Sequence, residues 1–449
     1  MRLLIKTALL IIICCGLFGG EIVGYHAVRR DMGEVLLSEN ADLSLVPSSC
    51  MKVVTVGAAL RLLDPKERFE THLEYDGWVD EHKTLHGNLY IRGGGDPCLG
   101  SERLSGSHPW KEQIGLFANA VEKIGIRSIQ GDIIGDATLW EKAGAAPSWC
   151  WEDLGNYYGA GASALSFHEN AYTASFKPGK QLGDQTELLC TEPPIFNLLI
   201  HNEVTSGPEG SGDRAWIFGT EYSPVQFMRG TIPLGVDAFS IKGAIPDPSN
   251  VCADLLSKEL EERGIRIEGE KIQEGKRVSF HVNYSPTIGE IAHVVNQNSM
   301  NLYAEHLVKK IGEKVSGEGS TRTGTDAIKT FWKSQNIDLC GWNIVDGSGL
   351  SRKNLMTARQ SVALLLNMEK SDQFPRFYLS LPQMEGTMRA KSGTQSMIKG
   401  YVGYTDHIAF AIFVNHCTDP KALKSTIDRF FAQIHTLEME CVLPSEKMP

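Results

Sequence analysis

At 449 residues, with 42% hydrophobic and 22% charged side chains, the chain has an ordinary globular composition and is long enough for about two or three domains. Its formal net charge of -10 disfavours nucleic acid and anionic membrane surfaces as main partners. Composition therefore indicates a folded, acidic protein.

The N-terminus has the pattern of a secretory signal. Two cations, Arg2 and Lys6, precede an uncharged, mainly apolar run over residues 7–18, and two glycines follow. The run is too short to span a bilayer comfortably, and no later stretch approaches the roughly 18 uninterrupted apolar residues of a membrane helix. We therefore expect residues 1–20 to be a signal peptide and the protein to be exported to the periplasm. A retained N-terminal membrane anchor is the alternative.

Cysteine placement indicates no metal site. Ten cysteines occur, two of them within the signal, and the remaining eight are scattered without a C-x-x-C pair, so we expect no metal and no cofactor. Export would permit disulfides, but the sequence leaves their pairing open. Cys50 is expected to be a small core-facing residue, because nothing pairs it with a histidine.

In chain order, the sequence predicts a mixed fold whose character changes near residue 69. Residues 22–28 and 34–38 indicate a β-hairpin, and a helix begins at Ser49 and ends by residue 64. Short glycine-punctuated strands follow at 71–75, 87–91, 129–134, 171–176, 215–218 and 278–284, with helices at 110–123 and 250–263. Helices return at 288–295, 302–311, 325–334 and 358–368, before strands 386–390, 398–404 and 408–415 and a helix over 422–435.

These elements predict a discontinuous first domain. The two strands at the front and the three at the back could close one antiparallel sheet. We therefore expect an α+β domain built from residues 21–67 and 286–449, interrupted by a β-rich region over 68–285. The inserted region is expected to contain two subdomains, the inner one at roughly 140–225.

One short motif suggests a nucleophile. Ser49 and Lys52 are three residues apart at the predicted helix start, so they share a face, and a neutral lysine amine there could take the proton of the serine hydroxyl. This is the S-x-x-K arrangement of penicillin-reactive enzymes. A second match at Ser396 to Lys399 has the same letters, so the motif alone does not decide between them.

Two further stretches would complete such a site. Ser299, followed by Met300 and Asn301 at a helix start, could shuttle a proton while the Asn301 amide holds the substrate backbone, although a plain helix cap is the simpler interpretation. Lys391, Ser392 and Gly393 at a strand edge would supply positive charge, a hydroxyl and room for the substrate backbone. Decoys with similar letters occur at 38–40, 334–336 and 322–324, the last in a predicted loop.

The three motifs occur in order and on suitable elements, and the chain then resembles the class C low-molecular-mass penicillin-binding proteins, the D-alanyl-D-alanine carboxypeptidase and endopeptidase family. Six stretches carry this resemblance, at residues 89–97, 131–136, 149–153, 230–235, 299–305 and 346–352. The resemblance implies a serine transpeptidase/β-lactamase-like fold, with a five-stranded antiparallel sheet flanked by helices, a helical subdomain and inserted β-rich domains.

The resemblance also implies residue roles. Ser49 would be the nucleophile and Lys52 the base. The second element would be Ser299 with Asn301, and the third Lys391, Ser392 and Gly393, with the backbone amides of Ser49 and Thr394 as oxyanion hole. The family usually has threonine where this chain has Ser392. Asp153 and Tyr158 resemble positions that meet the diamino-acid side chain of a stem peptide, and Arg352 would face the free carboxylate of that residue. Independently of the resemblance, the position of Ser396 at the strand edge beside the third motif suggests that it lines the cleft, although not as the nucleophile.

We therefore expect an exported serine D-alanyl-D-alanine carboxypeptidase or endopeptidase that acts on peptidoglycan stem peptides and is inhibited covalently by β-lactams. A β-lactamase or esterase on the same fold is one alternative, and a non-catalytic peptidoglycan-binding scaffold is another. The chain contains no H-E-x-x-H, and Gly161 to Leu165 misses the G-x-S-x-G elbow, so a zinc peptidase and an α/β-hydrolase are disfavoured.

Overall fold

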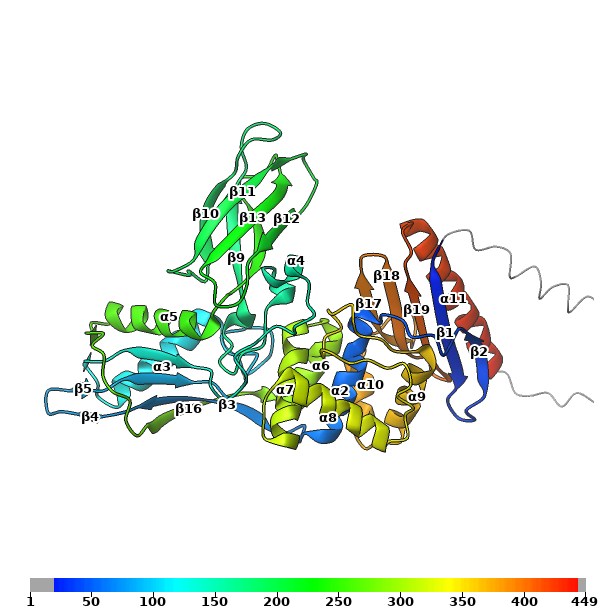
Figure 1. Cartoon of the computed structure of the whole chain (residues 1–449), viewed down its shortest axis with the longest axis horizontal. Helices are drawn as coiled ribbons and strands as arrows, with labels where there is room; N and C mark the ends of the chain where they lie inside the picture. Colours follow the sequence, from blue (N-terminus) through cyan, green and yellow to red (C-terminus); the bar gives the residue numbers. More distant parts are fainter. Residues whose placement is uncertain (1–19, 443–449) are drawn as a thin grey trace, which may run out of the picture.

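The two ends of the chain build one sheet. The structure, a computed structural model, describes residues 20–442. Strands β1 (Ile22–Arg29) and β2 (Val35–Glu39) join β17 (Arg389–Gln395), β18 (Ile398–Tyr404) and β19 (Ile408–Asn415) in the order β17-β18-β19-β1-β2 (Figure 1). Every pairing in this sheet is antiparallel. The expected discontinuous five-stranded sheet is therefore confirmed.

Helices cover both faces of this sheet. Strand β19 is buried along its whole length; Phe410 and Ile412 pack with Phe430 of α11 (Pro420–Val442), whereas Ala411 and Phe413 belong to the helical core on the other face. That core contains α2 (Met51–Leu62), α6 (Ile288–Gln297), α7 (Asn301–Ser316), α8 (Thr321–Ser334), α9 (Ala358–Glu369) and α10 (Phe374–Ser380). The expected α+β class is confirmed.

The inserted region leaves and re-enters this core through two paired strands. Strand β3 (Arg68–Tyr75) pairs antiparallel with β16 (Val278–Thr287), and β6 (Leu89–Arg92) and β8 (Ile133–Asp136) complete a four-stranded sheet. Helices α3 (Trp110–Lys123) and α5 (Pro248–Glu262) lie beside it (Figure 1). Four short strands form a second sheet: β4 (Trp78–Val79), β5 (Thr84–His86), β7 (Ser128–Ile129) and β15 (Arg266–Ile267).

A further β unit rises from the insertion. It has the sheets β10-β9-β14 and β11-β13-β12, formed by β9 (Ala171–Lys177), β10 (Glu187–Glu192), β11 (Leu199–Gly207), β12 (Arg214–Phe218), β13 (Val225–Pro233) and β14 (Phe239–Ala244) (Figure 1). The strand pairing continues past residue 225, so we propose that the inner subdomain runs to about residue 244 instead.

Several local predictions were wrong. The first C-terminal strand begins at Arg389, not at 386, because Gly386 has a positive φ of 63° and belongs to a turn. Consequently the Lys391 motif lies inside a strand. Residues 321–324 are helical, not a loop, because the Ser320 hydroxyl caps the first turn of α8. Helices α4 (Trp151–Leu154) and α10 and strands β4, β5, β10, β11, β13, β14 and β15 were not predicted.

The predicted signal peptide lies outside the described residues, apart from Gly20. Within 20–442, no helix is both long and apolar enough to cross a membrane. The apolar side of α11, including Ile427, Phe430 and Ile434, is core against the sheet, as expected.

Candidate active site

The first motif forms a tight turn that leads into a buried helix. Residues Ser48–Cys50 make a single 3-10 turn, and α2 follows directly from Met51, so the helix begins two residues later than predicted. Ser48 has a positive φ of 50°, a conformation that costs free energy in a serine and that is concentrated at functional sites. Ser49 is half-buried at the end of this strained approach.

Lys52 is fully buried and its ammonium nitrogen has three oxygen neighbours. Nζ lies 3.2 Å from Ser49 Oγ, 2.6 Å from Asn301 Oδ1 and 2.6 Å from the Ser348 carbonyl oxygen. Burial lowers the pKa of Lys52 to about 7, and the positive charge of Lys391 contributes in the same direction. Burial is the larger of these two causes. A fraction of the amine is therefore neutral near pH 7.

The third motif packs directly on the Ser48–Cys50 turn, which is called the nucleophile turn below after the candidate role of Ser49. Lys391 is buried in β17, and burial lowers its pKa to about 8. A Cβ on Gly393 would lie 2.4 Å from the Pro47 carbonyl oxygen and 3.0 Å from Cys50 N. This glycine therefore allows β17 to approach the turn, a reason different from the substrate contact that we expected. Cys50 Sγ reaches the Lys391 carbonyl at 3.4 Å, and burial raises the pKa of this thiol to about 12, which keeps it unreactive.

The second motif meets Lys52 through its asparagine. Asn301 is the first residue of α7; its Oδ1 accepts from Lys52, and its Nδ2 donates to the Tyr158 carbonyl at 2.8 Å. Ser299 precedes the helix with a positive φ of 57°. The helix N-cap is Met300, which makes no side-chain cap, so Ser299 is not the plain helix cap that the simpler interpretation required.

Sequence reasoning missed a loop that completes the site. Residues 346–351 bring the Ser348 carbonyl to Lys52. Two buried carboxylates accept hydrogen bonds from backbone amides of this loop: Glu305 of α7 accepts from Ser348, and Asp346, at the start of the loop, accepts from Ser351. Both lie in stretches that carried the family resemblance, but neither had been given a role. The available signal was a glutamate within a predicted helix, four residues after Asn301 and in a largely apolar stretch that runs from Leu302 to Val308.

The three residues expected to meet a diamino-acid side chain lie near one another. Asp153 belongs to α4 (Trp151–Leu154), and Tyr158 follows in a 3-10 turn at 157–159. Burial raises the pKa of Asp153, while Tyr158 and Arg352 act in the opposite direction. Arg352 comes from the far side of the 346–351 loop, with its guanidinium 3.7 Å from the Glu152 carboxylate.

The second S-x-x-K match lies on a β-hairpin. Ser396 is exposed in the turn between β17 and β18, and Lys399 is on β18, where its Nζ donates to Thr394 Oγ1 at 2.8 Å. These two residues are therefore not on one helix face. Ser392 is half-buried and Thr394 is exposed on the edge strand of the sheet, where alternate backbone amides are not used by β18.

Within residues 20–442, no group of three or more metal-ligating side chains is present, and the eight cysteines of this part are all unpaired. The site is built from serine, lysine, asparagine and backbone groups. Such an arrangement suits nucleophilic catalysis with a lysine base.

Comparison with known proteins identifies the family. The family model for the D-Ala-D-Ala carboxypeptidase 3 (S13) family matches residues 16–434. A D-alanyl-D-alanine carboxypeptidase of Actinomadura sp. (strain R39) is 26% identical over 443 residues, which cover 90% of this chain and 79% of that protein. The D-alanyl-D-alanine carboxypeptidase DacB of Haemophilus influenzae is 23% identical, over 86% of this chain and 80% of the relative.

Solved structures share the fold. Penicillin binding protein 4 (dacB) of Haemophilus influenzae superposes with a TM-score of 0.76 at 20% identity, over 89% of this chain and 91% of that one. The same protein in complex with a β-lactam gives a TM-score of 0.71. The family model covers most of the chain, and the chain therefore belongs to the D-Ala-D-Ala carboxypeptidase 3 (S13) family of serine peptidases.

Proposed function

We propose that the protein hydrolyses the terminal D-alanyl-D-alanine bond of peptidoglycan stem peptides through an acyl-enzyme on Ser49. The observation that carries this proposal is the Lys52 amine, which is fully buried, lies 3.2 Å from the Ser49 hydroxyl and has a pKa lowered to about 7. A lysine with this pKa can act as a general base near neutral pH. Family membership supports the substrate.

The reaction has two steps. Ser49 Oγ bonds to the carbonyl carbon of the penultimate D-alanine, and its proton passes to Lys52 Nζ, which keeps Asn301 Oδ1 and the Ser348 carbonyl as acceptors. The peptide C–N bond breaks, and the leaving amine takes a proton that the Ser299 hydroxyl relays from Lys52. Water then attacks the ester, releases the shortened peptide and restores the hydroxyl of Ser49.

Binding groups surround these atoms. The charge of Lys391 and the hydroxyl of Ser392 attract the terminal carboxylate, and the backbone amides of Ser49 and Thr394 receive the oxyanion. Gly393 contributes by seating β17 against the nucleophile turn.

A second set of residues would select the stem peptide. Asp153 and Tyr158 would hold the ammonium of its diamino acid, Arg352 would hold the free carboxylate of that residue, and Ser396 would line the outer cleft. Tyr158 and Arg352 both lower the pKa of Asp153, which supports the proposal that the three side chains lie in one binding site.

Export to the periplasm and cleavage of peptide cross-links are finer parts of the same proposal. The apolar run at residues 7–18 supports export, and an uncleaved N-terminus would retain the protein at the membrane. Cross-link cleavage uses the same acyl step, and an open side beyond the scissile bond would admit the larger leaving group. A cross-linked muropeptide assayed beside a linear pentapeptide separates the two activities.

Labelled penicillin tests the proposal. The wild-type protein should form one stoichiometric adduct, which peptide mapping places on Ser49, and Ser49→Ala should form none. Ser334→Ala is a matched control, because Ser334 begins a decoy S-x-N at the end of α8. An adduct at another residue, or no adduct with folded wild-type protein, would refute the proposed nucleophile. Rapid release of hydrolysed penicillin would favour a β-lactamase instead.

A further inference from the structure

Helix α7 carries three polar residues on one buried face. Asn301, Glu305 and Lys309 are spaced by four residues and therefore lie one above another along the helix. Only Asn301 belongs to the S-x-N motif. Glu305 is 1% exposed and Lys309 is 0% exposed. Two ionisable side chains outside the motifs are thus buried in line with an active-site asparagine.

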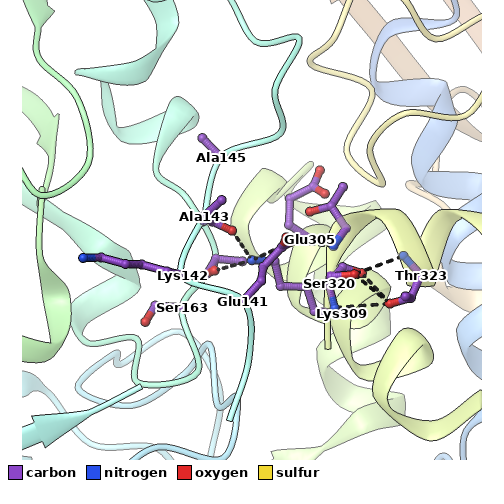
Figure 2. A network of polar contacts seen from close by, with 12 residues as sticks. Glu141, Lys142, Ala143, Ala145, Ser163, Glu305, Lys309, Ser320 and Thr323 are labelled. Atoms are coloured by element: carbon purple, nitrogen blue, oxygen red, sulfur yellow. Dashed lines mark hydrogen bonds and ion pairs between the residues drawn. The ribbon is translucent and has the colours of Figure 1, made fainter. Parts of the chain in front are cut away.

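Lys309 connects this face to the inserted region. Its Nζ donates to the Ala143 carbonyl at 2.6 Å and to the Ala162 carbonyl at 3.0 Å, and it lies 3.4 Å from the Glu141 carboxylate. Figure 2 shows this lysine against the 141–145 segment, with Glu305 on the same helix. These contacts with the inserted region explain why a charged Lys309 can be buried. They do not explain the burial of Glu305, one turn earlier on the same helix.

Glu305 is turned toward the loop that holds Lys52. Its Oε1 accepts hydrogen bonds from the backbone amides of Gly347 at 3.1 Å and Ser348 at 2.8 Å. The carbonyl of the same Ser348 accepts from Lys52 Nζ at 2.6 Å. A single residue therefore separates the Glu305 carboxylate from the ammonium nitrogen of Lys52.

The loop has little freedom to move on its own. A Cβ on Gly347 would meet Val308 Cγ2 at 2.3 Å, and Gly349 has a positive φ of 81° beneath the Ser48 carbonyl. Asp346, which is also buried, accepts from the Gly349 amide at 2.8 Å. Because the loop is closely packed, a change in its hydrogen-bonded anchor is transmitted to the Ser348 carbonyl.

The two carboxylates also oppose the lowering of the Lys52 pKa. Burial and Lys391 lower this pKa, whereas Asp346 and Glu305 raise it, with a smaller contribution from Cys50. Burial raises the pKa of Glu305 to about 7, and the charge of Asp346 adds to this. Titratable groups from the Ser48–Cys50 turn, β17, the 346–351 loop and α7 thus all affect the pKa of one amine.

Building on the function proposed above, we infer that Glu305 is a positioning residue for the acylation step. Its carboxylate holds the Ser348 carbonyl against Lys52 Nζ, and its negative charge sustains the affinity of that amine for the proton of Ser49. Glu305 does not touch the substrate. A purely structural link between helix and loop would affect stability, but it would not affect the proton affinity of Lys52.

The test is the pH dependence of acylation by labelled penicillin in Glu305→Gln. The glutamine carbonyl can still accept from both amides, but the charge is lost. The acid-side midpoint of the pH–rate profile should move down by a fraction of a pH unit, because Glu305, whose pKa is raised to about 7, carries only part of its negative charge near the midpoint. Glu305→Ala loses the hydrogen bonds as well, so its plateau rate should fall further than that of Glu305→Gln.

Two variants complete the experiment. Glu313→Gln makes the same change two turns further along α7, where the carboxylate accepts from Trp140 Nε1 and not from the loop; its midpoint should stay in place. Asp346→Asn removes the other charge and should shift the midpoint in the same direction as Glu305→Gln. Glu305→Ala also lacks the Glu305 charge, so its midpoint decides the question if Glu305→Gln is too unstable.

The possible results are distinct. A midpoint that stays in place in Glu305→Gln, or that moves to higher pH, would overturn the inference even if the rate falls and even if Asp346→Asn shifts. Failure of the wild-type protein to be acylated would instead refute the proposed function. A downward shift that Glu313→Gln does not reproduce would support Glu305 as the positioning residue.

Discussion

Replacing Gly393 by alanine tests how closely the third-motif strand must approach the nucleophile turn. A Cβ at this position lies 2.4 Å from the Pro47 carbonyl oxygen and 3.0 Å from Cys50 N. Ordinary van der Waals contact begins at 3.4 Å, and both neighbours are backbone atoms. Strand β17 therefore has to move away from the turn by about 1 Å, because a close-packed interior leaves no other way to relieve the overlap.

Two effects should follow from this displacement. Overpacking of this kind costs about 1–3 kcal/mol of the free energy of unfolding. A shift of about 1 Å between the nucleophile and the groups that position the substrate costs on the order of a hundredfold in rate. We therefore expect Gly393→Ala to be folded but less stable, with a second-order acylation rate constant about a hundredfold below that of the wild-type protein.

The assay is acylation by fluorescent penicillin, with thermal melting measured in parallel. Gly115→Ala is the matched control, because Gly115 lies within α3 and its added Cβ meets only the flexible end of Arg263 at 3.5 Å. The control should keep the wild-type acylation rate and gain up to about 1 kcal/mol in stability, since alanine favours a helix over glycine. If Gly393→Ala were acylated at the wild-type rate, close packing of β17 on the turn would not be needed for activity and the reasoning would be wrong.

Acylation should speed up as pH rises through about 7, because only the neutral Lys52 amine accepts a proton; Lys391→Met removes a cation that lowers the pKa of Lys52, so the midpoint of the pH–rate profile should move to higher pH. An unmoved midpoint would show that the charge of Lys391 does not contribute to the lowered pKa of Lys52. Asp153→Asn should lower kcat/KM about tenfold or more for stem peptides with a free diamino-acid ammonium, compared with the same peptide N-acetylated at that amine. An unchanged ratio between the two peptides would contradict this role. Burial lowers the pKa of His306 from 6.5 to about 4, so unfolding takes up a proton between these values, and urea unfolding should show a loss of up to about 3 kcal/mol as pH falls from 6.5 to 4. His306→Gln should lack this part of the pH dependence, and an identical profile in both proteins would exclude His306 as its source.

Local sequence was sufficient to predict the bounds of a helix or strand wherever the segment has a single, regular apolar pattern. The bounds of α3, β18 and β19 agree with the prediction, because regular apolar patterns in these segments end at recognisable turn or cap residues. The prediction failed for strands in which polar and apolar residues are mixed without a regular period. Strand β11 (Leu199–Gly207), for example, alternates between more and less exposed side chains, but its sequence Leu-Ile-His-Asn-Glu-Val-Thr-Ser-Gly does not alternate between apolar and polar residues.

The sequence also determined which chemical groups form the candidate site, but not the distances between those groups. It supplied two S-x-x-K matches, several S-x-N matches and two candidates for the third motif. Order along the chain and the family resemblance favoured one combination. The positive φ values at Ser48 and Ser299, and the need for glycine at 393, are properties of the backbone and its neighbours that no letter at those positions reveals.

Only the tertiary structure decided how the serine is activated. Lys52 meets Asn301 and Ser348, which are 249 and 296 residues away in sequence, and Glu305 reaches Lys52 only through the loop that contains Ser348. Burial is what lowers the pKa of this lysine to about 7. The amino-acid sequence by itself determined which groups are present, whereas long-range packing decided which of them are desolvated and which touch, and proton affinity depends on both.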